Sequence, residues 1–192
     1  MATGPSLDQA SVDLMYAQKG WRYIGISDCY RTCPWLDFFY ACDNRWWNHH
    51  YDAVMEWGGS NNGYWCTEGV TAKKYPQLNH INGGGGADWS ARQDRIHYGG
   101  NSGFQITNIA YLLGITTMVL VGFNMTVVGK QKHFFGDHPK GMSQNTSYHS
   151  FAGSFNGIKY KDKGITVINT AHPTKLTAFP QLPLQEAIDV CQ

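Results

Sequence analysis

The sequence predicts an α/β domain with a mainly parallel sheet. Segments with helical periodicity alternate along the chain with short apolar runs. Two of these runs, TTMVLVGF (116–123) and ITVINT (165–170), fit strands buried on both faces. Such strands are typical of parallel sheets covered by helices on both sides. We therefore expect an open sheet with right-handed crossovers, whose ligand lies outside the carboxyl ends of the strands.

The first half of the chain supplies two helices and two clear strands in this prediction. A helix over 8–20 ends at Gly20, a strand covers 22–27, and a second strand covers 37–43. A helix over 44–59 follows, with Asn44 as a cap candidate and a glycine pair to end it. Residues 60–95 are less informative: 63–67 and 77–81 fit short strands, and GGGGAD (83–88) fits a flexible loop.

The second half continues the alternation. A helix follows the glycine-rich turn 99–103, with Ile106, Ile109, Ala110 and Leu113 on one face and Gly114 at its end. The strand 116–123, a helix over 147–164, the strand 165–170 and a last helix over 182–191 complete the series. Pro183 lies near the first turn of that last helix, where proline is favoured. Together these elements predict one Rossmann-like, three-layer domain over 1–192.

Composition excludes several classes of partner. The formal net charge is +1 and no block of Lys or Arg occurs, so we expect neither bulk nucleic-acid binding nor attraction to anionic lipid. No stretch approaches the roughly 20 apolar residues that a membrane span needs. The five cysteines are odd in number and fit no zinc or redox spacing, which favours reduced thiols. These features predict a soluble, cytoplasmic protein.

The ends of the predicted strands supply the candidate binding residues. Small polar residues open four loops there: 28–31, 43–45, 124–125 and 169–172. The turn 99–103 lies instead at a helix N-terminus, where unpaired N–H groups and the helix dipole favour an anion such as phosphate. The plainer interpretation of Asn101 is a helix cap. Arg31 and Arg45 fit either a bound phosphate or carboxylate, or surface salt bridges.

A histidine-rich segment over 130–150 is the second candidate. His133, Asp137, His138 and His149 suit general acid–base chemistry, and they also suit a divalent metal bound by two imidazoles and a carboxylate. The third interpretation is a polar loop whose histidines face water. Because long loops rich in aromatic residues are usually functional, we favour a lid over about 126–148. On the helix over 44–59, His49 and His50 point in different directions, which favours solvated positions over paired metal binding.

Four motifs carry a resemblance to a known group of proteins. ISDCYRTCPWLDFFYACDNRWW, NSGFQITNIAYLLGITTMVLVGFNM, HFFGDHP and ITVINTAHPTKLTAFP resemble a group of phage-encoded proteins, from about Arg22 onward. That group is similar to the 6-hydroxymethylpterin diphosphokinase-like family and, more distantly, to bacterial sialyltransferases that use CMP-sialic acid. The resemblance implies a transferase that takes a nucleotide-activated donor. We expect no required cofactor, and a divalent metal is the less favoured alternative.

The resemblance also implies roles for individual residues. The residues it assigns to the nucleotide or donor are Asp28, Asp43, Asn44, Asn101, Ser102, Gly103, Gly122, Phe123 and Asn124. His138 takes the place of the general base, beside Asp137. The chain departs from both families where Gly-Phe-Asn stands at a strand end that usually carries Asp, and where the first loop lacks a glycine-rich start.

Three functions from different classes follow from the sequence. The first is a glycosyltransferase-like transferase, with nucleotide at 101–103, His138 as base, and Arg31, Arg45, His133 and His149 as candidates for phosphate or acceptor. The second is a non-catalytic nucleotide-binding phage accessory protein, which the replacement at Asn124 favours. The third is a metal-dependent phosphoester hydrolase that uses His133, Asp137 and His138.

Overall fold

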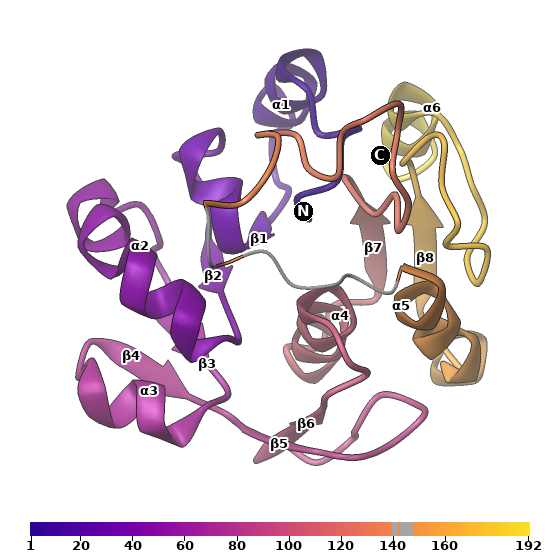
Figure 1. Cartoon of the computed structure of the whole chain (residues 1–192). Helices are drawn as coiled ribbons and strands as arrows, with labels where there is room; N and C mark the ends of the chain where they lie inside the picture. Colours follow the sequence, from indigo (N-terminus) through magenta and orange to yellow (C-terminus); the bar gives the residue numbers. More distant parts are fainter. Residues whose placement is uncertain (140–141, 143–147) are drawn as a thin grey trace.

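The computed structural model describes residues 1–139, 142 and 148–192 and shows an α/β chain with parallel strands (Figure 1). One sheet has the order β1-β2-β3-β4, and β5-β6 and β7-β8 form two further pairs, all parallel. The strands are β1 Ile24–Ile26, β2 Phe38–Tyr40, β3 Tyr64–Cys66, β4 Leu78–His80, β5 Asn82–Gly84, β6 Arg95–His97, β7 Thr117–Leu120 and β8 Thr166–Asn169.

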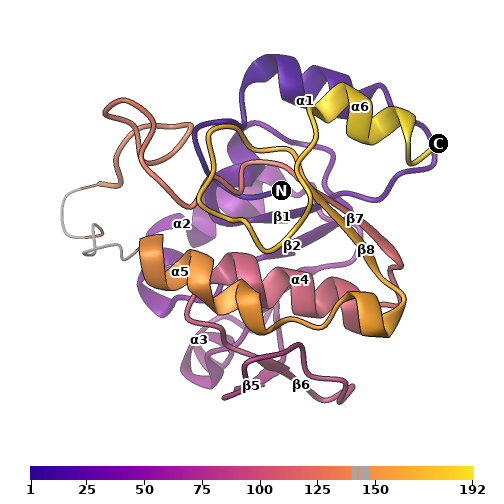
Figure 2. The same ribbon diagram turned by 90° about the vertical axis from the view of Figure 1, so that its right-hand side faces the viewer.

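Helices connect these strands. They are α1 Gln9–Tyr16, α2 Asn44–Trp57, α3 Gly69–Lys74, α4 Ser102–Leu112, α5 Tyr148–Ser154 and α6 Leu184–Asp189, with the short 3₁₀ turns η1 Ser27–Arg31, η2 Phe155–Gly157 and η3 Lys161–Lys163. Figure 2 shows α1 and α6 on one side of the strands and α4 and α5 on the other. None of the described helices is long and apolar enough to cross a lipid bilayer.

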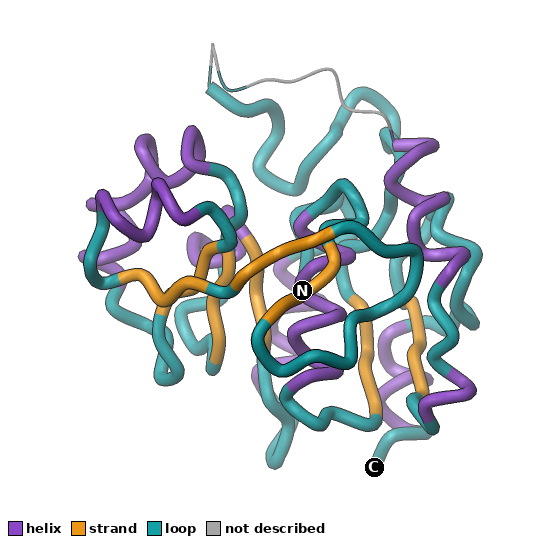
Figure 3. The backbone as a smooth tube through the Cα atoms, turned by 90° about the horizontal axis from the view of Figure 1, so that it is seen from below, coloured by secondary structure: helices purple, strands orange, loops and turns teal. Residues whose placement is uncertain are grey.

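The first residues of the chain join the two larger groups of strands. The Met1 nitrogen donates to the Ile24 carbonyl oxygen (2.6 Å), and the Ile26 N–H donates back to the Met1 carbonyl (3.2 Å). On the other side the Ala2 N–H donates to the Val121 carbonyl (2.8 Å). Residues 1–4 therefore lie between β1 and β7 as an extra strand, and Figure 3 shows the N-terminus between the strands on its left and the β7–β8 pair on its right.

Alternation along the strands builds a core on each side of the sheet. Phe38 and Tyr40 of β2 belong to the cluster that includes the apolar face of α4, whereas Phe39 and Ala41 belong to the cluster under α1 and α2. Phe39 has no exposed surface and contacts Trp47 at right angles, with ring centroids 5.9 Å apart. Burial of each such ring stabilises the fold by roughly 2–3 kcal/mol.

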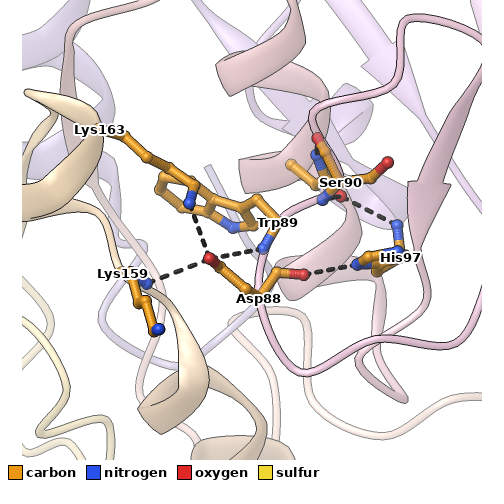
Figure 4. Close-up of polar contacts among 7 residues, drawn as sticks. Asp88, Trp89, Ser90, His97, Lys159 and Lys163 are labelled. Atoms are coloured by element: carbon orange, nitrogen blue, oxygen red, sulfur yellow. Dashed lines mark hydrogen bonds and ion pairs between the residues drawn. The ribbon is translucent and has the colours of Figure 1, made fainter.

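A polar network connects α4 to the loop between β5 and β6. The Asp88 carboxylate accepts hydrogen bonds from the Lys163 ammonium (2.7 Å) and from the Lys159 N–H (3.1 Å), and its carbonyl lies 2.7 Å from a ring nitrogen of His97 (Figure 4). The buried Asn108 side chain on α4 accepts from the N–H groups of Ser90 and His97, each at 2.9 Å. These bonds fix the loop between β5 and β6 against α4, and so fix the direction in which α4 points.

Two local expectations differ from the structure. The predicted flexible loop 83–88 begins inside a strand, because Gly83 and Gly84 pair with Ile96 and His97. A side chain at Gly83 would place its Cβ 2.1 Å from the Tyr98 ring, so glycine allows that ring to cover the strand. The predicted helix over 147–164 is interrupted, since only α5 is α-helical and two 3₁₀ turns follow it.

Candidate functional site

A cavity of about 240 Å³ opens at the carboxyl ends of β1, β2 and β7, at the N-terminus of α4. It brings together many of the residues predicted from the sequence: Asp43, Arg45, Asn101, Ser102, Gly103, Gly122, Asn124, His133 and His138. Lining residues that the sequence did not indicate include Thr3, Gly4, Ser27 and Trp46, and the predicted lid contributes Lys132 and Tyr148. Ser27 directly follows β1, so the expectation that a ligand lies at the carboxyl ends of the strands could have identified it. No local sequence signal marks residues 3 and 4.

The N-terminus of α4 presents backbone N–H groups to this cavity. Asn101 caps the helix by accepting from the Phe104 N–H (2.8 Å), and its side-chain nitrogen donates to the Gly99 carbonyl (3.1 Å). The Ser102 hydroxyl donates to the Cys42 sulfur at 3.2 Å. Side chains at the helix start are therefore engaged inside the protein. The N–H groups of Ser102 and Gly103 have no partner in the described part of the chain and remain for an anion.

The start of α2 contributes charge to the same cavity. Asp43 is the N-cap residue and makes no side-chain capping bond, and both Asp43 and Arg45 line the cavity. Asn44, predicted to contact the nucleotide, points elsewhere: its N–H donates to Glu68 (3.0 Å) and its side chain donates to Thr71 (2.9 Å). Asn44 thus ties α2 to α3 and does not line the cavity.

Two histidines close one side of the cavity. The rings of His133 and His138 lie 4.6 Å apart between centroids, and Phe135 stacks on His133 at 5.0 Å. His133 Nδ1 lies 3.2 Å from the Thr3 hydroxyl. Burial, assisted by the positive charge that His138 can carry, lowers the pKa of His133 to about 4. His138 lines the cavity, and its Nδ1 is buried and has no hydrogen-bond partner among the described residues.

Asp28 and Arg31 form an internal pair beside the site and do not line the cavity. Asp28 is 1% exposed; its carboxylate accepts from Arg31 Nε at 3.0 Å and from Trp46 Nε1 at 2.9 Å. The Arg31 guanidinium lies over the Phe135 ring, 5.6 Å from its centroid. The predicted contacts of Asp28 with nucleotide and of Arg31 with phosphate are therefore replaced by an anchor for the segment that carries His133 and His138.

His50 belongs to the same buried group, against the expectation of a solvated helix position. Its ring is 2% exposed and stacks on Trp46 at 4.4 Å, and its Nδ1 lies 3.1 Å from the Tyr30 hydroxyl. Burial lowers the pKa of His50 to about 4, although the nearby Asp28 carboxylate acts in the opposite direction. Two histidines beside the cavity, His50 and His133, are thus held neutral at pH 7.

Acid should therefore destabilise the fold between about pH 6.5 and pH 4. In the unfolded chain both imidazoles bind protons near pH 6.5, whereas in the folded chain His50 and His133 do so only near pH 4. The unfolded state binds more protons within this window, so the free energy of unfolding falls as the pH falls, by on the order of 5 kcal/mol for the pair. Urea unfolding at pH 7 and pH 4.5 measures the loss. His133→Asn should show a smaller loss and exposed His149→Asn the same loss as the natural chain; equal losses in all three would contradict the assignment.

The strand end Gly122-Phe123-Asn124 is shaped by internal contacts. Gly122 has φ +78°, and a Cβ there would lie 2.1 Å from the Ala2 carbonyl oxygen, so glycine admits the N-terminal strand. Phe123, predicted to line the binding site, is 1% exposed and packs in the core with Phe155. The Asn124 side chain accepts from the Ser6 N–H (3.1 Å) and hydroxyl (2.7 Å) and donates to the Pro173 carbonyl (2.7 Å).

The predicted lid is described in part. Residues 126–139 fold back on themselves through bridges between Val128 and Gln131 and between His133 and Gly136. The Phe134 N–H donates to the Thr3 carbonyl (3.0 Å), which fixes this part beside the cavity. Residues 140, 141 and 143–147 of the predicted lid lie outside the described residues.

The remaining candidates lie away from the cavity. Asp137 and His149 are both exposed, and neither lines the cavity. Within residues 1–139, 142 and 148–192, no cluster of three or more His, Cys, Asp or Glu side chains is arranged to hold a metal ion. His133 and His138 are neighbours, but the described residues add no third ligand to them.

Comparison of the chain with protein-family models, with curated proteins and with solved structures gave no match.

Proposed function

We propose that the cavity binds a nucleotide-activated donor and that the chain transfers the activated group to an acceptor hydroxyl, as a glycosyltransferase-like enzyme of Rossmann-like, three-layer architecture. One observation carries the proposal. The start of α4 with its unpaired N–H groups, the cation Arg45, and His138, whose buried Nδ1 has no hydrogen-bond partner among the described residues, all line one cavity of about 240 Å³. An anion site and a proton acceptor in the same cavity are the two parts that such a transfer needs.

The donor phosphate binds at the N-terminus of α4. The N–H groups of Ser102 and Gly103 donate to its oxygens, and the helix dipole favours its charge. Arg45 and Lys132, which line the cavity, supply positive charge near the same place. This charge stabilises the phosphate as it leaves, because negative charge grows on the departing oxygen when its bond to the transferred group breaks.

His138 takes the proton from the acceptor. The acceptor hydroxyl donates to the imidazole, its oxygen attacks the donor carbon, and the bond from that carbon to the phosphate oxygen breaks. The proton stays on His138 until the products leave, and the electron pair of the broken bond stays with the nucleotide phosphate. His133 is neutral at pH 7, so it adds no positive charge that would oppose protonation of His138.

A non-catalytic nucleotide-binding protein, such as a phage accessory protein, is the second candidate, and Asn124 favours it. The resembling families usually place a carboxylate at this strand end, whereas here the side chain is occupied by Ser6 and Pro173. This alternative keeps the phosphate site at α4 and assigns no proton transfer to His138. A metal-dependent hydrolase using His133, Asp137 and His138 stays a prediction, which the metal arm of the experiment below tests.

Thermal unfolding with added ligands separates the three functions. The chain is heated with nucleoside mono- and diphosphates, with CMP-sugars and with divalent metal ions, each alone and combined. A ligand that binds only the folded state at a hundred times its Kd stabilises it by about 2.7 kcal/mol. Stabilisation by a nucleotide without metal supports either nucleotide-binding function, and release of nucleotide from the donor then identifies the transferase. Stabilisation that requires metal supports the hydrolase.

Replacement of Gly103 should weaken nucleotide binding. A Cβ at this position would lie 3.0 Å from both the Phe123 ring and the Asn101 side-chain oxygen, at the place where the backbone must approach the phosphate. We expect Gly103→Ala to raise the nucleotide Kd at least about fivefold, measured by calorimetry. Gly153→Ala on α5 is the matched control, because a Cβ there meets nothing within 4 Å. Equal affinity of the two variants would place the nucleotide elsewhere.

A further inference from the structure

The space between β1 and β7 is one strand wide, and residues 1–4 fill only part of its length. Residues 1–4 pair with both neighbours, so β1 and β7 lie two strand spacings apart, about 9.6 Å. That extra strand covers only the carboxyl half of the gap, from Ile24 and Val121 onward. The amino half is open and forms a cavity of about 400 Å³, larger than the candidate active site. We call this cavity the strand gap.

Main-chain groups on both edges of the strand gap have no hydrogen-bond partner among the described residues. Thr116 accepts a hydrogen bond from Thr166 of β8, and Leu120 accepts one from Thr170, directly after β8. The even-numbered residues of β7 therefore face β8 and the odd-numbered ones face the gap. The N–H and C=O of Val119 consequently point into the gap without a hydrogen-bond partner among residues that the structure describes. The Ile24 N–H on β1 likewise points into the gap and has no hydrogen-bond partner among the described residues.

Apolar side chains cover the strand gap above and below the sheet plane. Met15 of α1 and Leu184 of α6 lie on one side, and Ile106 and Ala110 of α4 on the other. Trp21 also lines the cavity. A strand inserted here would be buried on both faces, so it must be apolar at successive positions and not only at alternate ones.

Exposed apolar residues stand next to the lining. Tyr16 is 67% exposed, Leu113 56% and Val190 66%, and they adjoin the lining residues Met15, Gly114 and Cys191 in sequence.

We propose that the strand gap binds an extended apolar segment of a partner protein, about three residues long, by adding it as a strand between β1 and β7. Residues 1–4 provide the argument for this occupant, because they are an extended segment in the same gap and bond to both edges through the main chain. The unpaired groups of Ile24 and Val119 continue that pattern. A free apolar molecule would leave those donors and acceptors unpaired.

The test uses a synthetic peptide of defined sequence. Acetyl-Thr-Val-Ile-Val-Thr-amide is titrated into the full chain, and Trp21 fluorescence and calorimetry report binding. The matched control is the same peptide with N-methyl groups on its three central residues, which removes the N–H donors and keeps the apolar side chains. Decanoate is titrated separately as a free apolar ligand. These probes do not involve the nucleotide cavity, so their outcome is independent of the proposed function.

Two protein variants locate the binding. Ala110→Phe fills the gap from α4, and Leu113→Glu places a charge at its edge without touching the core. Each should raise the Kd of the peptide at least about tenfold. Val70→Ser, at an exposed position on α3, is the control and should leave the Kd within about twofold.

The outcomes decide the proposal. Binding of the unmodified peptide, weakened at least about tenfold by N-methylation and by Leu113→Glu, supports strand addition. Equal binding of the two peptides, binding of decanoate alone, or no peptide binding would each overturn it.

Discussion

His138→Ala should lower the rate of nucleotide release from the donor at least about a hundredfold and change the nucleotide Kd less than about twofold. The phosphate site consists of backbone groups at α4 and of cations on other segments, so loss of one imidazole removes the proton acceptor and spares the anion site. Release of nucleotide in the presence of acceptor measures the rate, and calorimetry measures the binding.

His149→Ala is the matched control for this experiment. His149 is an exposed histidine outside the cavity lining, so both quantities should keep their natural values. Unchanged turnover in His138→Ala would remove His138 from the mechanism. Nucleotide binding without turnover in the natural chain would instead establish the non-catalytic function.

Asn124→Asp should destabilise the fold by about 2–3 kcal/mol, even though it restores the carboxylate that the resembling families usually carry. The Asn124 side-chain nitrogen donates to the Pro173 carbonyl oxygen at 2.7 Å, and aspartate would set two acceptors against each other there. Because the site is buried, the melting temperature should fall by roughly 5–10 °C at pH 8.

The pH dependence of this variant has a defined sign. Burial and the facing carbonyl raise the pKa of a carboxyl group at this position, and its protonated form can donate to Pro173. The difference in stability from the natural chain should therefore shrink as the pH falls from 8 to 4. Asp137→Asn, an exposed change of the same size, should have little effect at either pH. Full stability of Asn124→Asp at pH 8 would show that residue 124 is free to contact a ligand.

Strand and helix periodicity predicted much of the fold. The helix starting at Asn44, the helix starting at Ser102, and strands within 22–27, 116–123 and 165–170 are all present. The helices show the helical period, and the strands at 116–123 and 165–170 are apolar runs that suit burial on both faces. The short helix Gly69–Lys74 and the strand Asn82–Gly84 were not predicted. Gly83 is a strand residue because Tyr98 covers it, and that is a tertiary contact which no local pattern records.

Site residues were predicted correctly where the direction of the strands places them at the cavity. They were missed where side-chain packing determines which residue faces the cavity. Parallel strands bring Asp43 and Asn124 to one edge with the start of α4, as the topology requires. The turn after β1 instead places Ser27, at φ +48°, against the cavity and turns the next residue, Asp28, inward to Trp46. Which of two adjacent residues faces a ligand depends on such a turn, and the sequence alone does not give its direction.

The extra strand formed by residues 1–4 also bears on how the chain folds. Ala2 pairs with Val121, so this contact closes a very long loop, and contacts of that kind slow the folding of small domains. During synthesis β1 to β4 can pair with one another long before β7 leaves the ribosome. Residues 1–4 can pair on both sides only after Val121 has been made, so completion of the central sheet waits for the second half of the chain.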